Sequence, residues 1–232
     1  MPSSINNQPR KQGPRAVLWD LDGTILDSSH FHWLSWSAVL AAEGHPITYD
    51  QFISTFGQRN SEILQTYFGP DLSSTEIDRI SAAKEEKYRE LVRTRGIEPL
   101  PGVRRWLERL REDGWRQAIA SSAPLLNVET ILDALRIGDY FDAIVTGEDV
   151  DRGKPDPEVF LKAAAKLGAP PSRCVVVEDA PAGIEAARRA GMRVIGVLPS
   201  HSELSADLVA AALDDLPDNA FDGLLIAGEA KH

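Results

Sequence analysis

The feature that most constrains the fold is a series of short apolar runs that alternate with segments of helical spacing. The runs are AVLWD (16–20), RQAIAS (116–121), AIVTG (143–147), CVVVED (174–179) and RVIGVL (193–198). Apolar runs without polar alternation are typical of strands buried on both faces. The segments between the later runs, 103–113, 126–135, 157–168 and 181–191, have the apolar spacing of helices. This alternation predicts an α/β fold, a doubly wound parallel sheet with helices on both faces.

The segment between the first apolar run and the others has a different sequence pattern. No strand-like run occurs between residues 28 and 97, where polar amphipathic segments end at Gly44, Gly57, Gly69 and Gly96. We therefore expect an all-helical insertion at 28–97 in a core domain made of 15–27 and 98–232. Residues 1–14 are polar and contain Pro and Gly, which predicts a flexible tail.

The net charge and the composition limit the kinds of partner that this protein can bind. The chain carries 25 Lys and Arg against 35 Asp and Glu, a net charge of −10, which argues against nonspecific nucleic-acid binding. No apolar run approaches the roughly 20 residues that a membrane span needs. The single cysteine, Cys174, excludes an intramolecular disulfide and suits a reducing compartment. We expect a cytoplasmic protein, a monomer without nucleic-acid or membrane partners.

Polar side chains follow the apolar runs at the points where the strands should end. They are Asp20 and Asp22, Ser121 and Ser122, Lys154 in GKPDP, and Glu178 and Asp179. Open α/β sheets bind ligands at the carboxyl ends of their strands, so these side chains should converge. Carboxylates are ligands for Mg²⁺, and hydroxyls with an ammonium bind a phosphate. Asp20 and Asp22 would repel each other when both are ionised, and a metal ion or a shared proton would offset that repulsion.

Four motifs carry a resemblance to the haloacid dehalogenase (HAD) superfamily. DLDGT (20–24), ASS (120–122), GKPDP (153–157) and VEDAPAGIEAA (177–187) stand in the order and spacing of that family's motifs. The helical insertion resembles the family's C1-type cap. The resemblance covers about residues 15–222 and implies a Rossmann-like HAD core with an inserted cap.

The resemblance also implies roles for single residues. Asp20 would be the nucleophile that forms an aspartyl phosphate, and Asp22 the general acid/base. Mg²⁺ would be held by Asp20, the backbone carbonyl of Asp22 and Asp179, with Glu178 supporting them. Ser121 and Lys154 would hold the transferring phosphoryl group, although Ser121 could also merely cap the following helix. Candidate substrate contacts in the same motifs are Gly23, Thr24 and Ser122, the last with a structural role as the alternative.

Within the family, the sequence resembles β-phosphoglucomutase and its phosphatase relatives. His32, five residues after Asp27, Arg59 in FGQRN and Lys84 in KEEKY match cap-associated positions of the mutase. The resemblance implies substrate binding by these three residues. The alternatives are a packed interface for His32 and a solvated helix face for Lys84.

The sequence departs from the mutase at two places. Phe56 stands where the mutase has a lysine, and SAPLL, with Pro124, replaces its Lys-Asn pair. These departures favour a Mg²⁺-dependent phosphatase acting on a small phosphorylated metabolite, a sugar phosphate. The alternatives are a β-phosphoglucomutase-type isomerase, a phosphonatase with Lys84 as Schiff base, and a non-catalytic binding protein.

Overall fold

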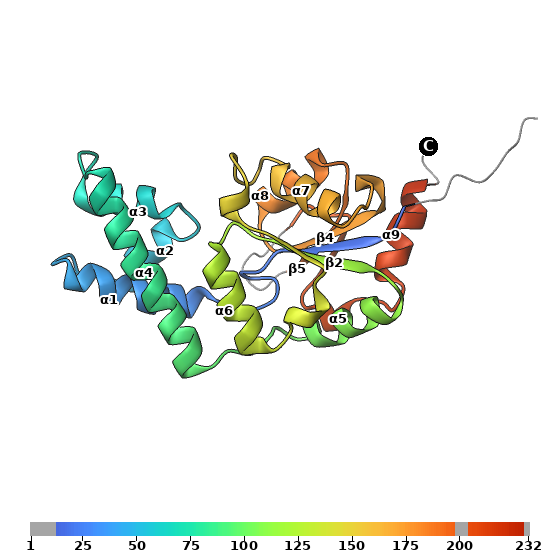
Figure 1. Cartoon of the computed structure of the whole chain (residues 1–232), viewed down its shortest axis with the longest axis horizontal. Coiled ribbons are helices and arrows are strands. Elements are labelled where there is room, and N and C mark those ends of the chain that lie inside the picture. Colours follow the sequence, from blue (N-terminus) through green and yellow to red (C-terminus); the bar gives the residue numbers. More distant parts are fainter. Residues whose placement is uncertain (1–12, 198–203, 230–232) are drawn as a thin grey trace, which may run out of the picture.

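A computed structural model describes residues 13–197 and 204–229, so most of the predicted tail lies outside the described residues. The core is one six-stranded parallel sheet in the order β3-β2-β1-β4-β5-β6 (Figure 1). Its strands are β1 (Ala16–Trp19), β2 (Arg116–Ala120), β3 (Ala143–Val145), β4 (Cys174–Glu178), β5 (Arg193–Val197) and β6 (Leu208–Ala210). The predicted fold class is confirmed, and β6 at the sheet edge is an addition to it.

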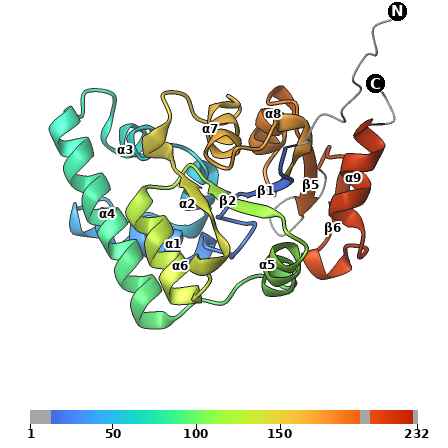
Figure 2. The same cartoon turned by 45° about the vertical axis from the view of Figure 1, so that its right-hand side comes forward.

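Helices cover both faces of the sheet (Figures 1 and 2). One face carries α5 (Val103–Glu112), α6 (Leu125–Leu135) and α9 (Ala220–Glu229), and the other carries α7 (Glu158–Lys166) and α8 (Pro181–Arg189). Single turns of 3₁₀-helix lie at Gly138–Tyr140, Gly147–Asp149, Pro171–Arg173 and Leu213–Asp215. The third of the predicted strands ends early, at Val145, because Thr146 caps the turn that follows.

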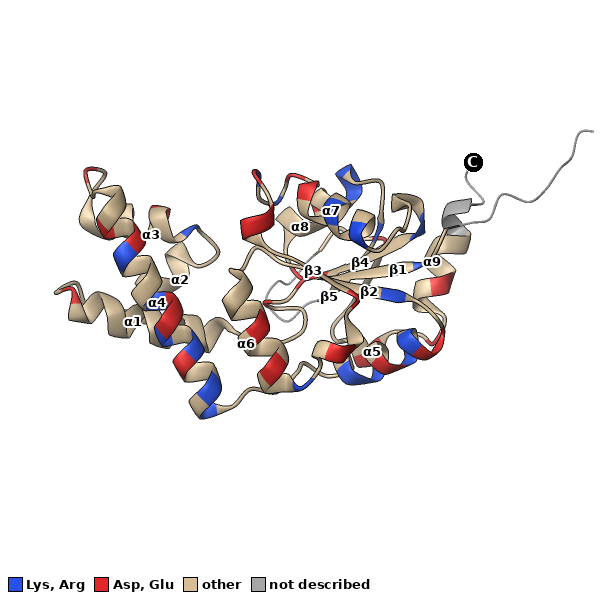
Figure 3. Cartoon of the chain, viewed as in Figure 1, with Lys and Arg blue, Asp and Glu red and all other residues tan. Residues whose placement is uncertain are grey.

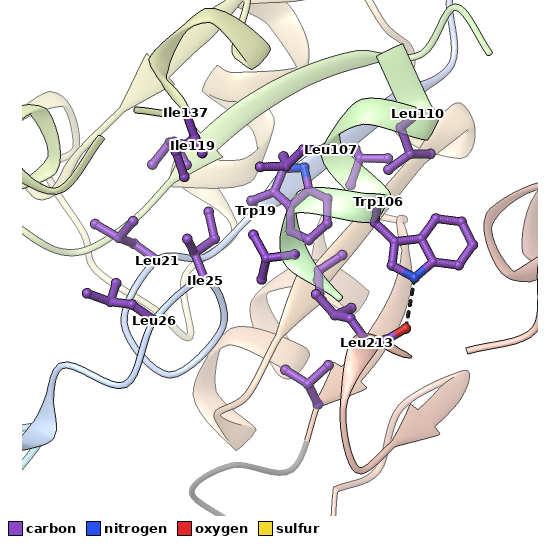
Figure 4. Close-up of a cluster of buried hydrophobic side chains, with 14 of the residues drawn as sticks. Trp19, Leu21, Ile25, Leu26, Trp106, Leu107, Leu110, Ile119, Ile137 and Leu213 are labelled. Atoms are coloured by element: carbon purple, nitrogen blue, oxygen red, sulfur yellow. Dashed lines mark hydrogen bonds between the residues drawn. The ribbon is translucent and has the colours of Figure 1, made fainter. Parts of the chain in front are cut away.

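β1 shows why its residues are all apolar. Val17 and Trp19 point into the core cluster beneath α5 and α6, whereas Ala16 and Leu18 point into the cluster beneath α7 and α8. All four are fully buried, as expected for the centre of a sheet covered on both sides. In the first cluster Trp106 packs near Trp19 and donates from Nε1 to the Leu213 carbonyl at 2.8 Å (Figure 4).

Four helices lie between β1 and α5, and we call them the cap. They are α1 (Ser29–Ala42), α2 (Tyr49–Thr55), α3 (Asn60–Phe68) and α4 (Ser74–Arg95). The cap has its own small core, which includes Trp36, Phe52 and Ile80. The last helix, α4, also reaches the main domain, because Tyr88 and Val92 belong to the main core cluster. The boundaries at residues 28 and 97 stay predictions.

Positively and negatively charged side chains are mixed along the outer helices. Figure 3 shows Lys and Arg next to Asp and Glu on both α4 and α5. On α5, Arg105 and Arg109 pair with Asp214 and Asp218. Among the described residues, no helix is both long and apolar enough to cross a membrane.

Candidate active site

The loop after β1 brings the first two aspartates to the carboxyl edge of the sheet. The Asp20 amide donates to the Val177 carbonyl at 3.0 Å, which continues the pairing of β1 with β4. The chain then turns back on itself, since Gly23 N donates to the Leu26 carbonyl at 2.8 Å and Ile25 N to the Leu21 carbonyl at 2.9 Å. The tight loop holds Asp20 and Asp22 close to the ends of the neighbouring strands.

Three buried carboxylates converge at this edge. One ligand oxygen each from Asp20, Glu178 and Asp179 lies within 4.8 Å of the others. Lys154, on the loop after β3, donates from Nζ to Asp20 Oδ1 at 2.5 Å and to Glu178 Oε1 at 2.7 Å. Residues at the carboxyl ends of β1 and β4 and a lysine more than a hundred positions from Asp20 thus form one cluster, as the strand-end argument predicts.

The cluster holds more negative than positive charge. Burial raises the pKa of Asp20 well above its usual value, and Glu178 and Asp179 add to this while Lys154 opposes it. Burial and the neighbouring Glu178 raise the pKa of Asp179 to about 7. Burial disfavours the Lys154 ammonium, but Asp20 and Glu178 outweigh it and raise the pKa of Lys154. A hard divalent cation would neutralise this excess, and the oxygen donors suit it, so these carboxylates fit a metal site.

Two glycines make room for the carboxylates. At Gly23, which has φ +85°, a Cβ atom would lie 2.1 Å from Asp179 Oδ2. At Gly183, in the first turn of α8, it would lie 1.6 Å from Glu178 Oε1. Glu178 also accepts a hydrogen bond from the Ala180 amide at 2.7 Å. The first turn of α8 therefore packs directly against the Glu178 side chain, which is buried.

Gly183→Ala tests this close packing. We expect the added methyl group to displace the Glu178 carboxylate from Lys154, reducing turnover by about 10-fold and the free energy of unfolding by about 1–3 kcal/mol. Gly138→Ala is the matched control, because a Cβ there meets nothing closer than 4.0 Å. Steady-state kinetics and urea unfolding of both variants would measure the effects. Equal behaviour of the two variants would contradict the proposed crowding.

Asp22 lies beside a buried pair from the cap. His32 Nε2 is 3.6 Å from Asp22 Oδ1, a buried oxygen without a hydrogen-bond partner among the described residues. Lys84 Nζ contacts His32 Nδ1 at 3.0 Å and Glu85 Oε1 at 2.9 Å. His32 stacks on Tyr88, with the ring centroids 4.4 Å apart. Lys84 is only 2% exposed, so the solvated-face alternative for this lysine is wrong.

The electrostatics of this group differ from those of the carboxylate cluster. Burial opposes the ionised form of Asp22, but His32, Ser28 and Lys84 outweigh it, and the pKa of Asp22 is lowered. Burial and the nearby Lys84 charge lower the pKa of His32. The arrangement favours a neutral imidazole next to an ionised Asp22.

A cleft of about 720 Å³ opens between the cap and the core. Its cap wall includes Trp36, Phe52, Phe56, Arg59 and Lys84, and its core wall includes Asp22, Ser121, Ser122, Pro124 and Lys154. A Cβ atom at Gly153 would lie 3.4 Å from the Arg59 guanidinium, so this cap arginine comes close to the loop that carries Lys154. Eight of these ten cleft residues, all but Trp36 and Phe52, were singled out from the sequence as candidate contacts or departures.

The remaining candidates fall into two groups. Ser121 is buried, and its Oγ accepts from the Ala123 amide at 3.0 Å, while Ser122 is exposed at the cleft wall. Gly23 and Thr24 are not part of the cleft wall; Thr24 is buried and its Oγ1 contacts Asp179 Oδ1 at 3.4 Å. The structure supports a packing role around Asp179 for these two residues, and substrate contact by them stays a prediction.

Sequence reasoning missed Glu85 and Asn127. Glu85 lies in the charged run KEEKYRE and looks like one more solvated acid, and Asn127 follows the second strand without a motif. Both line the cleft and both have side chains engaged in hydrogen bonds. The spacing of Ile77, Ile80, Lys84 and Tyr88 along α4 is the signal that indicates a buried face at this point.

Comparisons with known proteins agree with this geometry. Residues 14–191 match the family described as haloacid dehalogenase-like hydrolase. β-Phosphoglucomutase from Bacillus subtilis is 35% identical over 208 residues, covering 87% of this chain and 91% of the relative. Fructose-1-phosphate phosphatase YqaB from Escherichia coli is 34% identical over 187 residues, covering 78% and 95%.

A solved structure shows the same architecture. The crystal structure of β-phosphoglucomutase from Clostridium difficile superposes with a TM-score of 0.81 at 27% identity, covering 94% of this chain and 99% of that one. The expected resemblance is therefore confirmed, and with it the expectation of catalysis rather than mere binding. The chain is an enzyme that belongs to the haloacid dehalogenase-like hydrolase family.

Proposed function

We propose that this enzyme is a Mg²⁺-dependent phosphatase that hydrolyses a small phosphorylated metabolite, in the first instance a sugar phosphate, through an aspartyl phosphate on Asp20. The observation that carries the proposal is the setting of Asp20. Its carboxylate is bound to Lys154, stands within a cluster of buried acids, and lies two residues from Asp22 at the cleft wall.

The residues divide the reaction into two halves. Asp22, ionised in the free enzyme, takes up a proton from solvent before the first half. In that half an Asp20 oxygen attacks phosphorus, the bond from phosphorus to the leaving oxygen breaks, and Asp22 gives that oxygen its proton. In the second, Asp22 takes a proton from water, whose oxygen attacks phosphorus and releases Asp20 and inorganic phosphate. Ser121 Oγ and Lys154 Nζ would hold the phosphoryl oxygens through both halves, since such reactions depend mainly on positioning and charge neutralisation.

The excess of buried carboxylates supports a metal ion. Asp20, Asp179 and the backbone carbonyl of Asp22 would hold Mg²⁺, with Glu178 supporting them and holding Lys154. When bound, the ion would supply positive charge to the transferring phosphoryl group. The all-oxygen donor set supports a hard divalent cation such as Mg²⁺.

The volume of the cleft and the names of the relatives support a small phosphorylated substrate. The cleft has the volume of a metabolite-binding site. The names of the two relatives, β-phosphoglucomutase and fructose-1-phosphate phosphatase, both refer to sugar phosphates. Monomeric state and cytoplasmic location stay predictions.

An isomerase of the β-phosphoglucomutase kind is the second candidate. It is favoured by His32 and Lys84, which match that enzyme's cap positions and lie buried next to Asp22. Phe56 and Pro124 argue against it, because both line the cleft and neither can bind a second phosphate. The phosphonatase alternative gains no support, since the Lys84 amine is engaged by His32 and Glu85.

A substrate panel separates these functions. We expect free phosphate from one or a few sugar phosphates in the presence of Mg²⁺, and loss of that activity with a chelator. The panel includes β-glucose 1-phosphate with a trace of the 1,6-bisphosphate. Formation of glucose 6-phosphate without free phosphate would establish the isomerase instead. If a folded protein formed neither free phosphate nor glucose 6-phosphate, both candidate functions would be refuted.

A further inference from the structure

Glu85 on α4 is the centre of a hydrogen-bond network that the proposed reaction leaves without a role. Its Oε1 accepts from Lys84 Nζ at 2.9 Å and from Asn60 Nδ2 at 2.8 Å, and its Oε2 accepts from Asn127 Nδ2 at 2.6 Å. The Glu85 side chain is only 12% exposed. A single carboxylate thus satisfies three donors in a nearly closed environment.

The partners of Glu85 come from different parts of the molecule. Asn60 begins α3 of the cap, directly after Arg59, whereas Asn127 belongs to α6 of the core. Asn127 is itself fixed, because its Oδ1 accepts from Arg89 Nη1 at 2.9 Å. Glu85 therefore ties the cap to the core at the edge of the cleft.

Lys84 continues the network towards Asp22. It has 3% of its side chain exposed, and in its charged form it can only donate hydrogen bonds. His32 Nδ1 must then accept from it, which leaves the imidazole proton on Nε2, the nitrogen that faces Asp22 Oδ1. Without Glu85, the buried ammonium would lose the carboxylate that holds it in place, a costly arrangement.

We propose that Glu85 is a positioning residue for Asp22. It holds Lys84 against His32, selects the His32 tautomer that faces Asp22, and anchors both to the cap through Asn60 and to the core through Asn127. The kinetic consequence rests on the proposed function, because it assumes that Asp22 donates a proton to the leaving group. The consequence for His32 follows from the geometry alone.

The kinetic test compares two leaving groups in E85Q. Phenyl phosphate needs a proton donor for its leaving oxygen, whereas nitrophenolate leaves p-nitrophenyl phosphate without one. We expect E85Q to lower kcat on phenyl phosphate by about 10–100-fold, with KM changed by less than about threefold. Release of nitrophenolate in the first turnover should fall by less than about threefold.

E90Q is the matched control. Glu90 lies on the same helix and carries the same charge, but its side chain is 54% exposed and pairs with Lys87, which is 35% exposed. We expect E90Q to stay within about twofold of the unchanged enzyme on both substrates.

A second readout does not depend on turnover. Nitrogen NMR of the His32 ring, identified by its loss in His32→Gln, should show a protonated Nε2 in the unchanged enzyme and a tautomer mixture in E85Q. If the unchanged enzyme released no phosphate from any substrate, the proposed function would fail while these signals still decided the role of Glu85.

Two results would overturn the inference. One is unchanged kinetics and unchanged His32 signals in E85Q. The other is an equal fall on both substrates with unchanged His32 signals, which would mark Glu85 as purely structural. If E85Q fails to fold, Asn60→Ala at the half-buried start of α3 removes one anchor of Glu85, and the same pattern is expected at smaller size.

Discussion

Asp20→Asn is expected to abolish turnover, by about 10⁴-fold or more, while the protein stays folded. The amide keeps the size of the side chain and can still accept a hydrogen bond from Lys154. It cannot attack phosphorus as a carboxylate does, so no aspartyl phosphate forms. Removing one of three crowded acids also relieves repulsion with Glu178 and Asp179, and we expect the melting temperature to be unchanged or higher.

Phosphate release and circular dichroism melting would measure both effects. Asp27→Asn is the control, because Asp27 lies in the same loop but is exposed and accepts hydrogen bonds from its near neighbour Ser29. Acid quenching during turnover should trap a base-labile phosphoenzyme in the control and none in Asp20→Asn. Near-normal activity of purified Asp20→Asn would refute Asp20 as the nucleophile.

Lys154→Ala is expected to reduce kcat/KM by about 10²–10³-fold. The ammonium is the positive group that contacts both Asp20 and Glu178, so its loss leaves the carboxylates and the incoming phosphate to repel one another. The same change removes the partner of two buried acids, and the free energy of unfolding should fall by about 1–3 kcal/mol.

Lys162→Ala provides the comparison for this variant. Lys162 is on α7, is 45% exposed, and pairs with Glu158 at the surface. We expect it to leave kcat/KM unchanged and to alter stability by less than about 1 kcal/mol. If Lys154→Ala retained the kcat/KM of Lys162→Ala, Lys154 would have no part in holding phosphate.

The carboxylate cluster could be predicted from the sequence. Asp20, Lys154, Glu178 and Asp179 each follow an apolar run, and parallel strands bring their carboxyl ends to one edge. The structure places all four in contact or within a few ångströms of one another. Glycine spacing in the cap also predicted helix ends, since Gly69 and Gly96 directly follow α3 and α4 with φ of +95° and +74°.

The surroundings of Asp22 were harder to predict from the sequence. Lys84 and Glu85 stand in a run of charges that is typical of a solvated face, yet both are largely buried. Burial of Lys84 depends on Trp36 and Tyr88, whose rings lie 5.6 and 5.5 Å from its ammonium, and on Glu85. Trp36 comes from α1 and is brought there by the fold, whereas Tyr88 and Glu85 lie beside Lys84 on α4.

The sequence by itself determined the parallel sheet, the helical insertion and the set of acids at the strand ends. It could do so because both signals are patterns of nearby residues. Unbroken apolar runs indicate strands buried on both faces, and their alternation with helical segments indicates a parallel sheet. Only the tertiary structure decided which charges are buried together, because that depends on how the cap sits on the core. Glu85 shows this most clearly: its three partners come from α3, α4 and α6, and no pattern along the chain places those helices side by side.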